Sequence, residues 1–240
     1  MKKLRLEEIL IERGWAKDTN DAFVVVTEGK VFINGQKAVS PAQPVSPDTK
    51  IEIRVGHGYV GRGALKLEAA LEKFGIDVSG KVCADIGSAT GGFTEVLLRR
   101  GAEKVYAIDT ARGKLALKLR EDPRVVVMEG MDVRDIELLP DPVLVAVIDV
   151  SLIPLQEILP YVKRLLPEKG VVVALFKPQY QTRDNKILKH GIIEDKKERE
   201  KLLEDFLQWA EERAWKIEGT MESPIRGSEG NTEYLVHLSV

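Results

Sequence analysis

Four charged residues of the sequence have the types that a proton-transfer site needs: Lys66, Asp149, Lys177 and Glu233. They are far apart in sequence. Asp149 and Lys177 follow apolar runs that predict buried strands, and Glu233 directly precedes another such run. The ends of these predicted strands bring the three residues to one rim of a sheet, and the helix beginning near residue 64 can bring Lys66 over that rim. Taken singly, each residue would by default belong to a surface ion pair.

A glycine loop that follows the apolar run 82–86 is the second candidate site. Asp85 lies at the carboxyl end of the predicted strand, where open α/β sheets place their ligands. The glycines of the loop let the backbone approach a ligand closely. A serine replaces the second glycine of the dinucleotide pattern G-x-G-x-x-G. The loop therefore indicates a nucleotide-like cofactor of another kind, and an ordinary strand-to-helix turn is the alternative. Its residues are Asp85, Gly87, Ser88, Gly91, Gly92 and Phe93.

Two further acids follow predicted strands beyond this loop. Asp109 ends the run 104–109, about 20 residues past the glycines, where an acid can accept hydrogen bonds from ribose hydroxyls. Asp132 comes shortly after the run 125–128. Asp132 is equally compatible with a helix cap.

Strands and helices must alternate to place these residues. After residue 64, apolar runs that predict strands alternate with amphipathic segments that predict helices, among them 153–166 and 196–213. This alternation predicts an α/β fold with a doubly wound, mostly parallel sheet. The strands near 215–222 and 234–240 complete it.

The composition limits the class of protein. The 240 residues, 44% of them hydrophobic, allow one large domain and one small one. With 36 basic and 38 acidic residues the net charge is -2, so nucleic-acid binding must come from local patches. Cys83 is the single cysteine, which fits a reducing compartment. No apolar stretch reaches the length of a membrane span, and acidic residues interrupt any secretory signal near the start. We therefore expect a cytoplasmic protein.

The first quarter of the chain predicts a small module of two helices and a hairpin, with Asn34-Gly35 as the hairpin turn. The expected boundaries are 1–56 for this module, 57–63 for a glycine-rich linker and 64–240 for the larger domain. The module resembles the S4 RNA-binding domain, which implies RNA contacts by Arg5 and Lys30. Thr19-Asn20 stands where that family usually has Ser-Arg. Residues 1–60 hold nine basic and eight acidic residues, so an interaction module without RNA is the alternative. The segments that carry the resemblance are Arg5-Leu6-Glu7, Leu10, Gly14, Ala22, Gly29-Lys30-Val31, Ile33-Asn34-Gly35 and Val45.

The larger domain resembles the class I S-adenosylmethionine-dependent methyltransferases through its D-x-G-x-x-x-G-G-F loop. The order Lys, Asp, Lys, Glu is similar to the catalytic tetrad of RNA 2′-O-methyltransferases. Local segments resemble the TlyA family of ribosomal RNA methyltransferases, some of whose members are labelled hemolysins. Two departures are Leu152 and Tyr180-Gln181, where that family often has Phe and Phe-Glu. The segments are Arg62-Gly63-Ala64-Leu65-Lys66-Leu67, Asp149-Val150-Ser151, Lys177-Pro178-Gln179, Ser223-Pro224-Ile225 and Gly230-Asn231-Thr232-Glu233.

The resemblance implies a seven-stranded class I sheet, S-adenosyl-L-methionine as methyl donor and a ribose 2′-hydroxyl of ribosomal RNA as acceptor, with cytidine as the target. A ribose hydroxyl is a weak nucleophile and must lose its proton as it attacks. Lys177 is the expected base, because burial and a second ammonium, that of Lys66, favour a neutral amine. Asp149 and Glu233 would hold the lysines in line. The cofactor is expected against the loop residues, Asp109, Asp132, Val133 and Asp149.

RNA contacts are also expected from a basic segment. Residues 99–124 contain eight basic and four acidic residues, although charged helix faces also serve solubility. Together with the linker arginine, the candidates in the larger domain are Arg62, Arg99, Arg100, Arg112 and Lys114. A monomer and a homodimer are both compatible with the sequence.

Other chemistries have weaker support. An adenine-amine methyltransferase would need an Asn/Asp-Pro-Pro-aromatic run where this chain has Asp149-Val150-Ser151-Leu152. A cytosine-carbon methyltransferase needs a nucleophilic cysteine, and Cys83 lies within a predicted core strand. The three histidines are scattered, so no metal site is expected. A non-catalytic RNA-binding or ribosome-assembly factor and a membrane-active hemolysin are the remaining alternatives.

Overall fold

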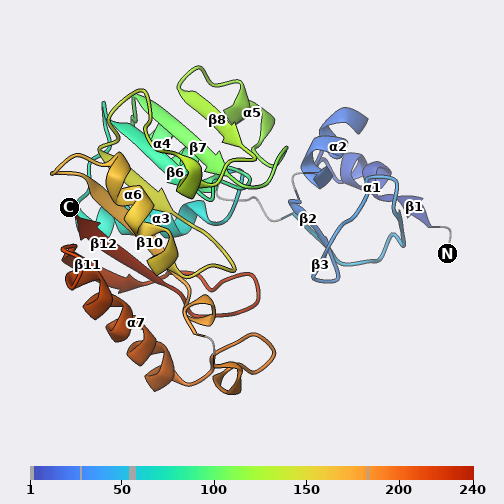
Figure 1. The fold of residues 1–240 in the computed structure, drawn as a ribbon. Helices are drawn as coiled ribbons and strands as arrows, with labels where there is room; N and C mark the ends of the chain where they lie inside the picture. The colour runs from blue at the N-terminus through green and yellow to red at the C-terminus, as the bar shows by residue number, and fades with distance from the viewer. Residues whose placement is uncertain (1–2, 28, 54–57, 183) are drawn as a thin grey trace. The chain divides into compact units, whose positions relative to one another are not determined.

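The computed structural model describes residues 3–27, 29–53, 58–182 and 184–240 (Figure 1). The chain divides into two compact units, Met1–Gly58 and Tyr59–Val240. Part of the predicted linker, His57, lies outside the described residues. Residues 59–63 belong to the larger unit, where the Tyr59 hydroxyl donates to Glu68 at 2.8 Å.

The smaller unit packs two helices against short strands. Leu6, Ile9 and Leu10 of the first helix are buried together with Val31 of the hairpin. Asn34 and Gly35 both have positive φ, 49° and 83°, as a tight hairpin turn requires. The elements are β1 (Leu4–Arg5), α1 (Leu6–Glu12), α2 (Thr19–Thr27), β2 (Val31–Ile33), β3 (Gln36–Lys37), β4 (Pro44–Val45) and β5 (Ile51–Ile53).

The larger unit is built on a seven-stranded sheet of order β11-β12-β10-β9-β6-β7-β8. Strand β12 is antiparallel to both of its neighbours, and the pairs among β6 to β10 are parallel. The predicted mostly parallel, doubly wound seven-stranded sheet is confirmed. The strands are β6 (Val82–Ile86), β7 (Lys104–Asp109), β8 (Val125–Glu129), β9 (Val145–Ile148), β10 (Val171–Phe176), β11 (Lys216–Glu222) and β12 (Tyr234–Ser239).

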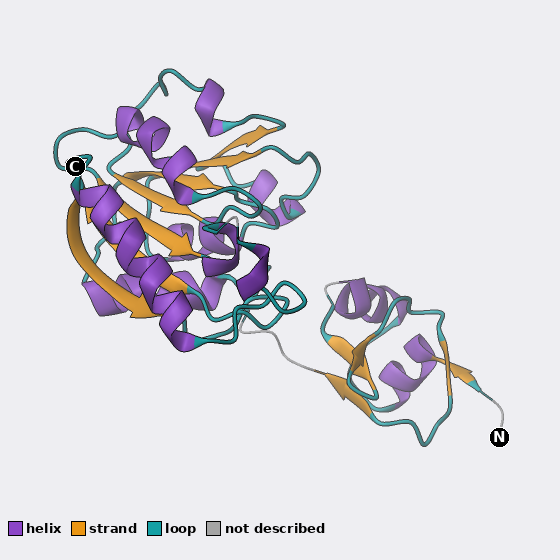
Figure 2. Cartoon of the chain, turned by 60° about the horizontal axis from the view of Figure 1, so that its bottom comes forward, coloured by secondary structure: helices purple, strands orange, loops and turns teal. Residues whose placement is uncertain are grey.

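Helices cover both faces of this sheet (Figure 2). Successive side chains of a strand point to opposite faces, so Cys83 packs with α3 and α4 while Ala84 packs with α6 and α7. The result is a three-layer arrangement with two apolar cores. The α-helices are α3 (Ala64–Phe74), α4 (Gly92–Arg99), α5 (Leu117–Arg120), α6 (Leu159–Leu165) and α7 (Lys196–Glu211), and the short 3-10 turns are η1 (Val133–Asp135), η2 (Leu155–Glu157), η3 (Pro178–Tyr180) and η4 (Asn185–Ile187).

The helix predicted over 153–166 is wrong in its extent. The segment forms the 3-10 turn η2 and then the shorter helix α6. Pro160 explains the interruption, because proline has no N–H to donate to the preceding turn and is tolerated in the first turn of a helix, where it lies in α6.

Among the residues that the structure describes, no helix is both long enough and apolar enough to cross a membrane.

Candidate active site

The crevice between β6 and β9 is where the order of the strands reverses. Such a switch point is the place where open α/β sheets bind ligands. Gly87 follows β6 with φ +85° and lies against the backbone of Asp149, which follows β9. A Cβ on Gly87 would come within 2.9 Å of the carbonyl carbon of Asp149 and closer still to its oxygen. Glycine is therefore required for the two strand ends to meet.

A pocket of about 580 Å³ opens at this crevice. Its size falls within the range typical of small-molecule sites. One side is formed by the ends of β6 and β7, another by the segment around η1, and a third by the segment after β9. Its lining residues are Ile86, Gly87, Ala89, Ile108, Asp109, Thr110, Met131, Asp132, Val133, Arg134, Asp149, Val150, Ser151, Leu152, Ile153, Pro154, Glu157 and Ile158.

Asp109 and Asp132 both line this pocket. Asp109 accepts the backbone N–H groups of Ala89 and Ala111 at 2.8 and 2.7 Å, which fixes its carboxylate at the end of β7. Asp132 accepts the backbone N–H of Arg134 and also pairs with its guanidinium at 2.6 Å. The Arg134 guanidinium lowers the pKa of Asp132. Asp132 thus caps η1 and also lines the pocket. The two alternatives left open by the sequence, a helix cap and an acid that contacts the cofactor, are therefore compatible.

Asp85 is not at the pocket surface. It is fully buried at the end of β6, where one oxygen accepts the Thr94 hydroxyl at 2.6 Å. Its other oxygen has no hydrogen-bond partner among the described residues. Burial raises the pKa of Asp85 to about 7, against the effect of the Thr94 hydrogen bond. Asp85 therefore supports the loop from beneath by holding the first turn of α4.

The other loop residues also lie behind the pocket surface. Gly91 has φ +95° and begins α4, and a side chain there would collide with Leu119. Gly92 packs against the backbone of residues 61–64. Phe93 and Ser88 are buried. These residues shape the loop, whereas Gly87 reaches the cavity itself.

Lys177 ends β10 and turns its ammonium toward two residues that follow β9. Nζ lies 2.6 Å from Asp149 Oδ1 and 2.9 Å from Ser151 Oγ. Lys177 is 8% exposed. A lysine so deeply enclosed needs a partner for its charge, and Asp149 provides it.

Lys66 on α3 pairs with Glu233, the residue before β12. Lys66 is 7% exposed and Glu233 3%. Gly227 makes room for this carboxylate, because a Cβ there would lie 2.5 Å from Glu233 Oε1. Taken singly in the sequence, Lys66 fitted a surface ion pair; the structure encloses it because its partner comes from a segment far along the chain.

The two ion pairs share one rim of the sheet. Phe176 pairs with Tyr234 in the antiparallel register, so Lys177 and Glu233 are the next residues on adjacent strands. Gly63, one turn before Lys66, is close enough to Asp149 that its Cβ would lie 3.8 Å from Oδ2. The structure therefore brings together the four charged residues that the sequence singled out.

Comparison with known families identifies the larger unit. Residues 59–240 match the family of FtsJ-like methyltransferases. The chain belongs to this family. The expected class I methyltransferase fold agrees with that membership.

Similar proteins extend over the whole chain. Hemolysin A of Brachyspira hyodysenteriae is 38% identical over 99% of this chain and 100% of its own length. The 16S/23S rRNA (cytidine-2′-O)-methyltransferase TlyA of Mycobacterium tuberculosis is 38% identical over 99% of this chain and 90% of its own. A structure from Streptococcus thermophilus, provisionally described as a hemolysin, superposes with a TM-score of 0.75 at 36% identity, covering 100% of this chain and 89% of that one. The resemblance to the TlyA family is confirmed.

Cysteine and metal chemistry have little support in the described residues. Burial raises the pKa of the Cys83 thiol to about 12, so a thiolate nucleophile is not formed near neutral pH. No group of three or more His, Cys, Asp or Glu side chains in the described ranges is arranged to hold a metal ion.

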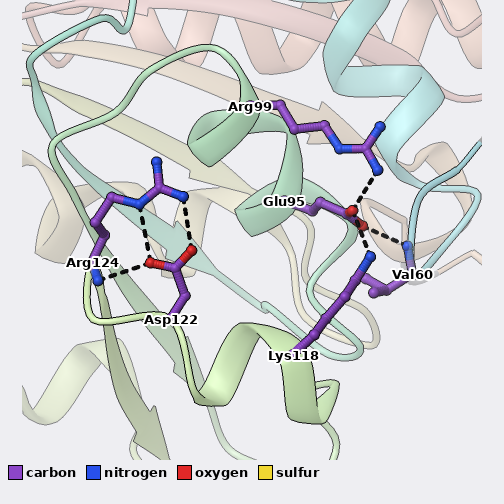
Figure 3. A network of polar contacts seen from close by, with 6 residues as sticks. All are labelled: Val60, Glu95, Arg99, Lys118, Asp122 and Arg124. Atoms are coloured by element: carbon purple, nitrogen blue, oxygen red, sulfur yellow. Dashed lines mark hydrogen bonds and ion pairs between the residues drawn. The ribbon is translucent and has the colours of Figure 1, made fainter.

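The basic segment 99–124 is largely paired with acids that lie outside it. Glu95 accepts Arg99 and Lys118, both at 2.7 Å, and the Val60 backbone N–H (Figure 3). Arg100 forms a two-point contact with Glu68. The positive excess counted along the sequence is therefore smaller in space, because five of its cations pair with carboxylates from other segments. The pairs are Arg99–Glu95, Lys118–Glu95, Arg100–Glu68, Lys104–Asp141 and Arg120–Glu129.

The remaining RNA candidates differ in their surroundings. Arg112 and Lys114 are exposed on the loop before α5. Arg62 is exposed just before the start of α3, and Lys30 is half-buried in the smaller unit. Arg5 pairs with Glu7 at 3.1 Å.

Three polar residues of the site were not singled out by sequence reasoning. Thr94 holds Asp85, Ser151 holds Lys177, and Gln181 bridges two loops by accepting the Leu155 N–H and donating to the Lys177 carbonyl. The signal for Thr94 was its place directly after the G-G-F of the glycine loop. Ser151 and Gln181 lie beside motif residues but bond to partners 26 positions away, which one sequence does not reveal.

Proposed function

We propose that this chain transfers a methyl group from S-adenosyl-L-methionine to a ribose 2′-hydroxyl of ribosomal RNA, with cytidine as the target nucleoside. Such a substrate places its work in the cytoplasm. The observation that carries the proposal is the presence of two ion pairs, Lys177–Asp149 and Lys66–Glu233, at one rim of the sheet, where Asp149 also lines the pocket of about 580 Å³. TlyA of Mycobacterium tuberculosis, similar along nearly the whole chain, carries the name of this activity.

The pocket fits the proposed methyl donor. S-adenosylmethionine combines a ribose, an adenine ring and a charged amino-acid end. Asp109 can accept the ribose hydroxyls, and Asp132 with Val133 can meet the polar edge and the face of the adenine. Ile108 and Ile153 supply apolar walls. When bound, the donor supplies a methyl group on a positively charged sulfur.

Lys177 is proposed to act as the general base. Its Nζ takes the proton of the ribose 2′-hydroxyl as the oxygen attacks the methyl carbon, and the ammonium so formed stays paired with Asp149. General-base assistance of this kind contributes about 10²- to 10⁴-fold in rate. The remaining acceleration comes from alignment of oxygen, methyl carbon and sulfur.

Lys66 and Glu233 are proposed to complete the rim. The Lys66 ammonium provides a second positive charge at the same rim as Lys177. Glu233 fixes Lys66 and prevents it from turning toward solvent. The smaller unit, by its resemblance to S4 domains, is proposed to bind RNA.

Methyl transfer to isolated ribosomal subunits tests the proposal. The subunits are purified from cells that lack the protein, and incorporation from radiolabelled S-adenosylmethionine is followed by mapping of ribose methylation. We expect incorporation at a cytidine 2′-oxygen by the wild-type protein and a loss of at least about 100-fold in Lys177→Met. No incorporation by a wild-type protein that binds S-adenosylmethionine in calorimetry would refute the proposal and favour a non-catalytic assembly factor.

A matched variant separates chemistry from folding. Lys163→Met also removes a half-buried lysine that donates two hydrogen bonds, here to the carbonyls of Arg213 and Ala214 at the end of α7. It lies away from the rim, so methyl transfer should continue at the wild-type rate. Equal losses in Lys163→Met and Lys177→Met would contradict a specific role for Lys177.

A further inference from the structure

The surroundings of the Lys177 amine hold a third polar group besides the two ion pairs. Ser151 Oγ lies 2.9 Å from Nζ, and Asp149 Oδ1 lies 2.6 Å from it. Both acceptors come from the segment that follows β9, whereas Lys177 comes from the end of β10. The amine is thus held from one side by two oxygens.

We propose that Ser151 is a positioning residue that aims the lone pair of Lys177 at the substrate hydroxyl. A neutral amine has two N–H bonds and one lone pair in a tetrahedral arrangement. The two N–H bonds are directed to Asp149 and Ser151, so the lone pair must take the remaining direction. The inference rests on the proposed function, in which this amine is the base.

Asp149 alone does not fix that direction. With one acceptor, one N–H is directed to Asp149, and the lone pair can then occupy either of the two remaining staggered positions about the Cε–Nζ bond. The second acceptor leaves a single orientation that satisfies both hydrogen bonds. When the proton arrives, the new N–H lies along the former lone pair, and the other two hydrogen bonds are unchanged.

A separate contact holds Ser151 at this distance. The Gln181 side chain accepts the Leu155 N–H at 3.1 Å and donates to the Lys177 carbonyl at 3.3 Å. It therefore ties the segment that carries Ser151 to the residue whose amine Ser151 accepts. Leu152, the next residue, has φ +68°, a costly backbone conformation for leucine. The segment is held in a specific bend that places the hydroxyl of Ser151 toward Nζ.

Three variants test this role in methyl transfer to ribosomal subunits under single-turnover conditions. Ser151→Ala removes the acceptor, and Ser151→Thr keeps a hydroxyl at the same carbon. Ser239→Ala is the matched control, since the Ser239 hydroxyl also contacts a charged side chain, Glu218 at 2.8 Å, but at the opposite end of β12. Calorimetry measures the affinity of each protein for S-adenosylmethionine.

We expect Ser151→Ala to lower the rate of methyl transfer about ten-fold, a part of the whole general-base contribution. Its affinity for S-adenosylmethionine should stay within about two-fold of wild type, Ser151→Thr should restore most of the rate, and Ser239→Ala should match wild type. The loss should appear across the pH–rate profile as a lower plateau.

Three results would overturn the inference while the wild-type protein is active. They are an unchanged rate in Ser151→Ala, no recovery in Ser151→Thr, and a loss confined to the affinity for S-adenosylmethionine, which would assign Ser151 to the cofactor pocket. Failure of the wild-type protein to methylate any subunit would instead refute the proposed function, so the two failures are distinguishable.

Discussion

Asp85 gives the structure a measurable dependence of stability on pH. The residue is fully buried, and burial raises the pKa of its carboxyl from 3.8 to about 7. The folded protein therefore holds a proton that the unfolded chain releases between these two values. Because the folded state binds more protons in this window, its stability falls as the pH rises through it.

The magnitude follows from the size of the shift. One pKa unit corresponds to about 1.4 kcal/mol, so a shift of about three units costs up to about 4 kcal/mol once Asp85 is ionised. The contribution is absent below about pH 4 and complete above about pH 7. Asp85→Asn removes the ionisation and keeps an oxygen for the Thr94 hydroxyl. Its new N–H₂ group faces the position that lacks a partner, which adds a cost of about 1–3 kcal/mol that does not vary with pH.

Urea unfolding from pH 4 to pH 8 measures both the pH-dependent cost of ionising Asp85 and the pH-independent cost of the unpaired amide group in Asp85→Asn. The fluorescence of Trp209 and Trp215 reports on the larger unit, and a Trp15→Phe background removes the signal of the smaller one. We expect Asp85→Asn to be less stable than its parent near pH 4 and the difference to shift in its favour by up to about 4 kcal/mol toward pH 8. Parallel curves for the two proteins over this range would refute the assigned protonation.

Other perturbations have defined outcomes. Gly87→Ala should destabilise the larger unit by about 2 kcal/mol or more and weaken S-adenosylmethionine binding, since alanine is strained at φ +85° and collides with the backbone of Asp149. Urea unfolding measures the stability and calorimetry the affinity, and wild-type values of both would contradict the geometry. Lys66→Met should lower the free energy of unfolding by about 3 kcal/mol, because Glu233 is left buried and unpaired. The double variant Lys66→Met/Glu233→Leu should recover much of this loss, whereas additive losses from the two substitutions would argue against the pair. When RNA binding is measured at several salt concentrations, Arg112→Ala should reduce the slope of log affinity against log salt concentration by about 1. Arg100→Ala should reduce it by less, because Arg100 is paired with Glu68. Equal effects would show that Arg100 leaves Glu68 to bind an RNA phosphate.

The strands and the glycine loop could be predicted because local chemistry determines them. The run 82–86 is β6 at the predicted bounds, since five nearly apolar residues before a glycine have few alternatives. The amphipathic pattern after residue 196 gave helix α7 to within two residues of its observed end. Pro160 was the local signal that was overlooked in the segment 153–166.

Contacts between distant segments could not be predicted in the same way. The sequence placed acids and lysines at one rim, but the choice of partners, Lys177 with Asp149 and Lys66 with Glu233, depends on how α3 packs over β12. Counting charge along residues 99–124 likewise missed Glu68 and Glu95, which approach from α3 and α4. Asp85 is buried behind the loop with its carboxylate bound by the Thr94 hydroxyl. A threonine at position 94 is compatible with several local structures, so the sequence does not reveal this contact.

The Lys66–Glu233 pair spans 167 positions of the chain. During synthesis, Lys66 leaves the ribosome long before Glu233 is added, and α3 must meanwhile keep its ammonium hydrated. Lys66 can become buried only after the antiparallel strand β12 pairs with β10. The arrangement proposed for methyl transfer is therefore completed only when the last strand is in place.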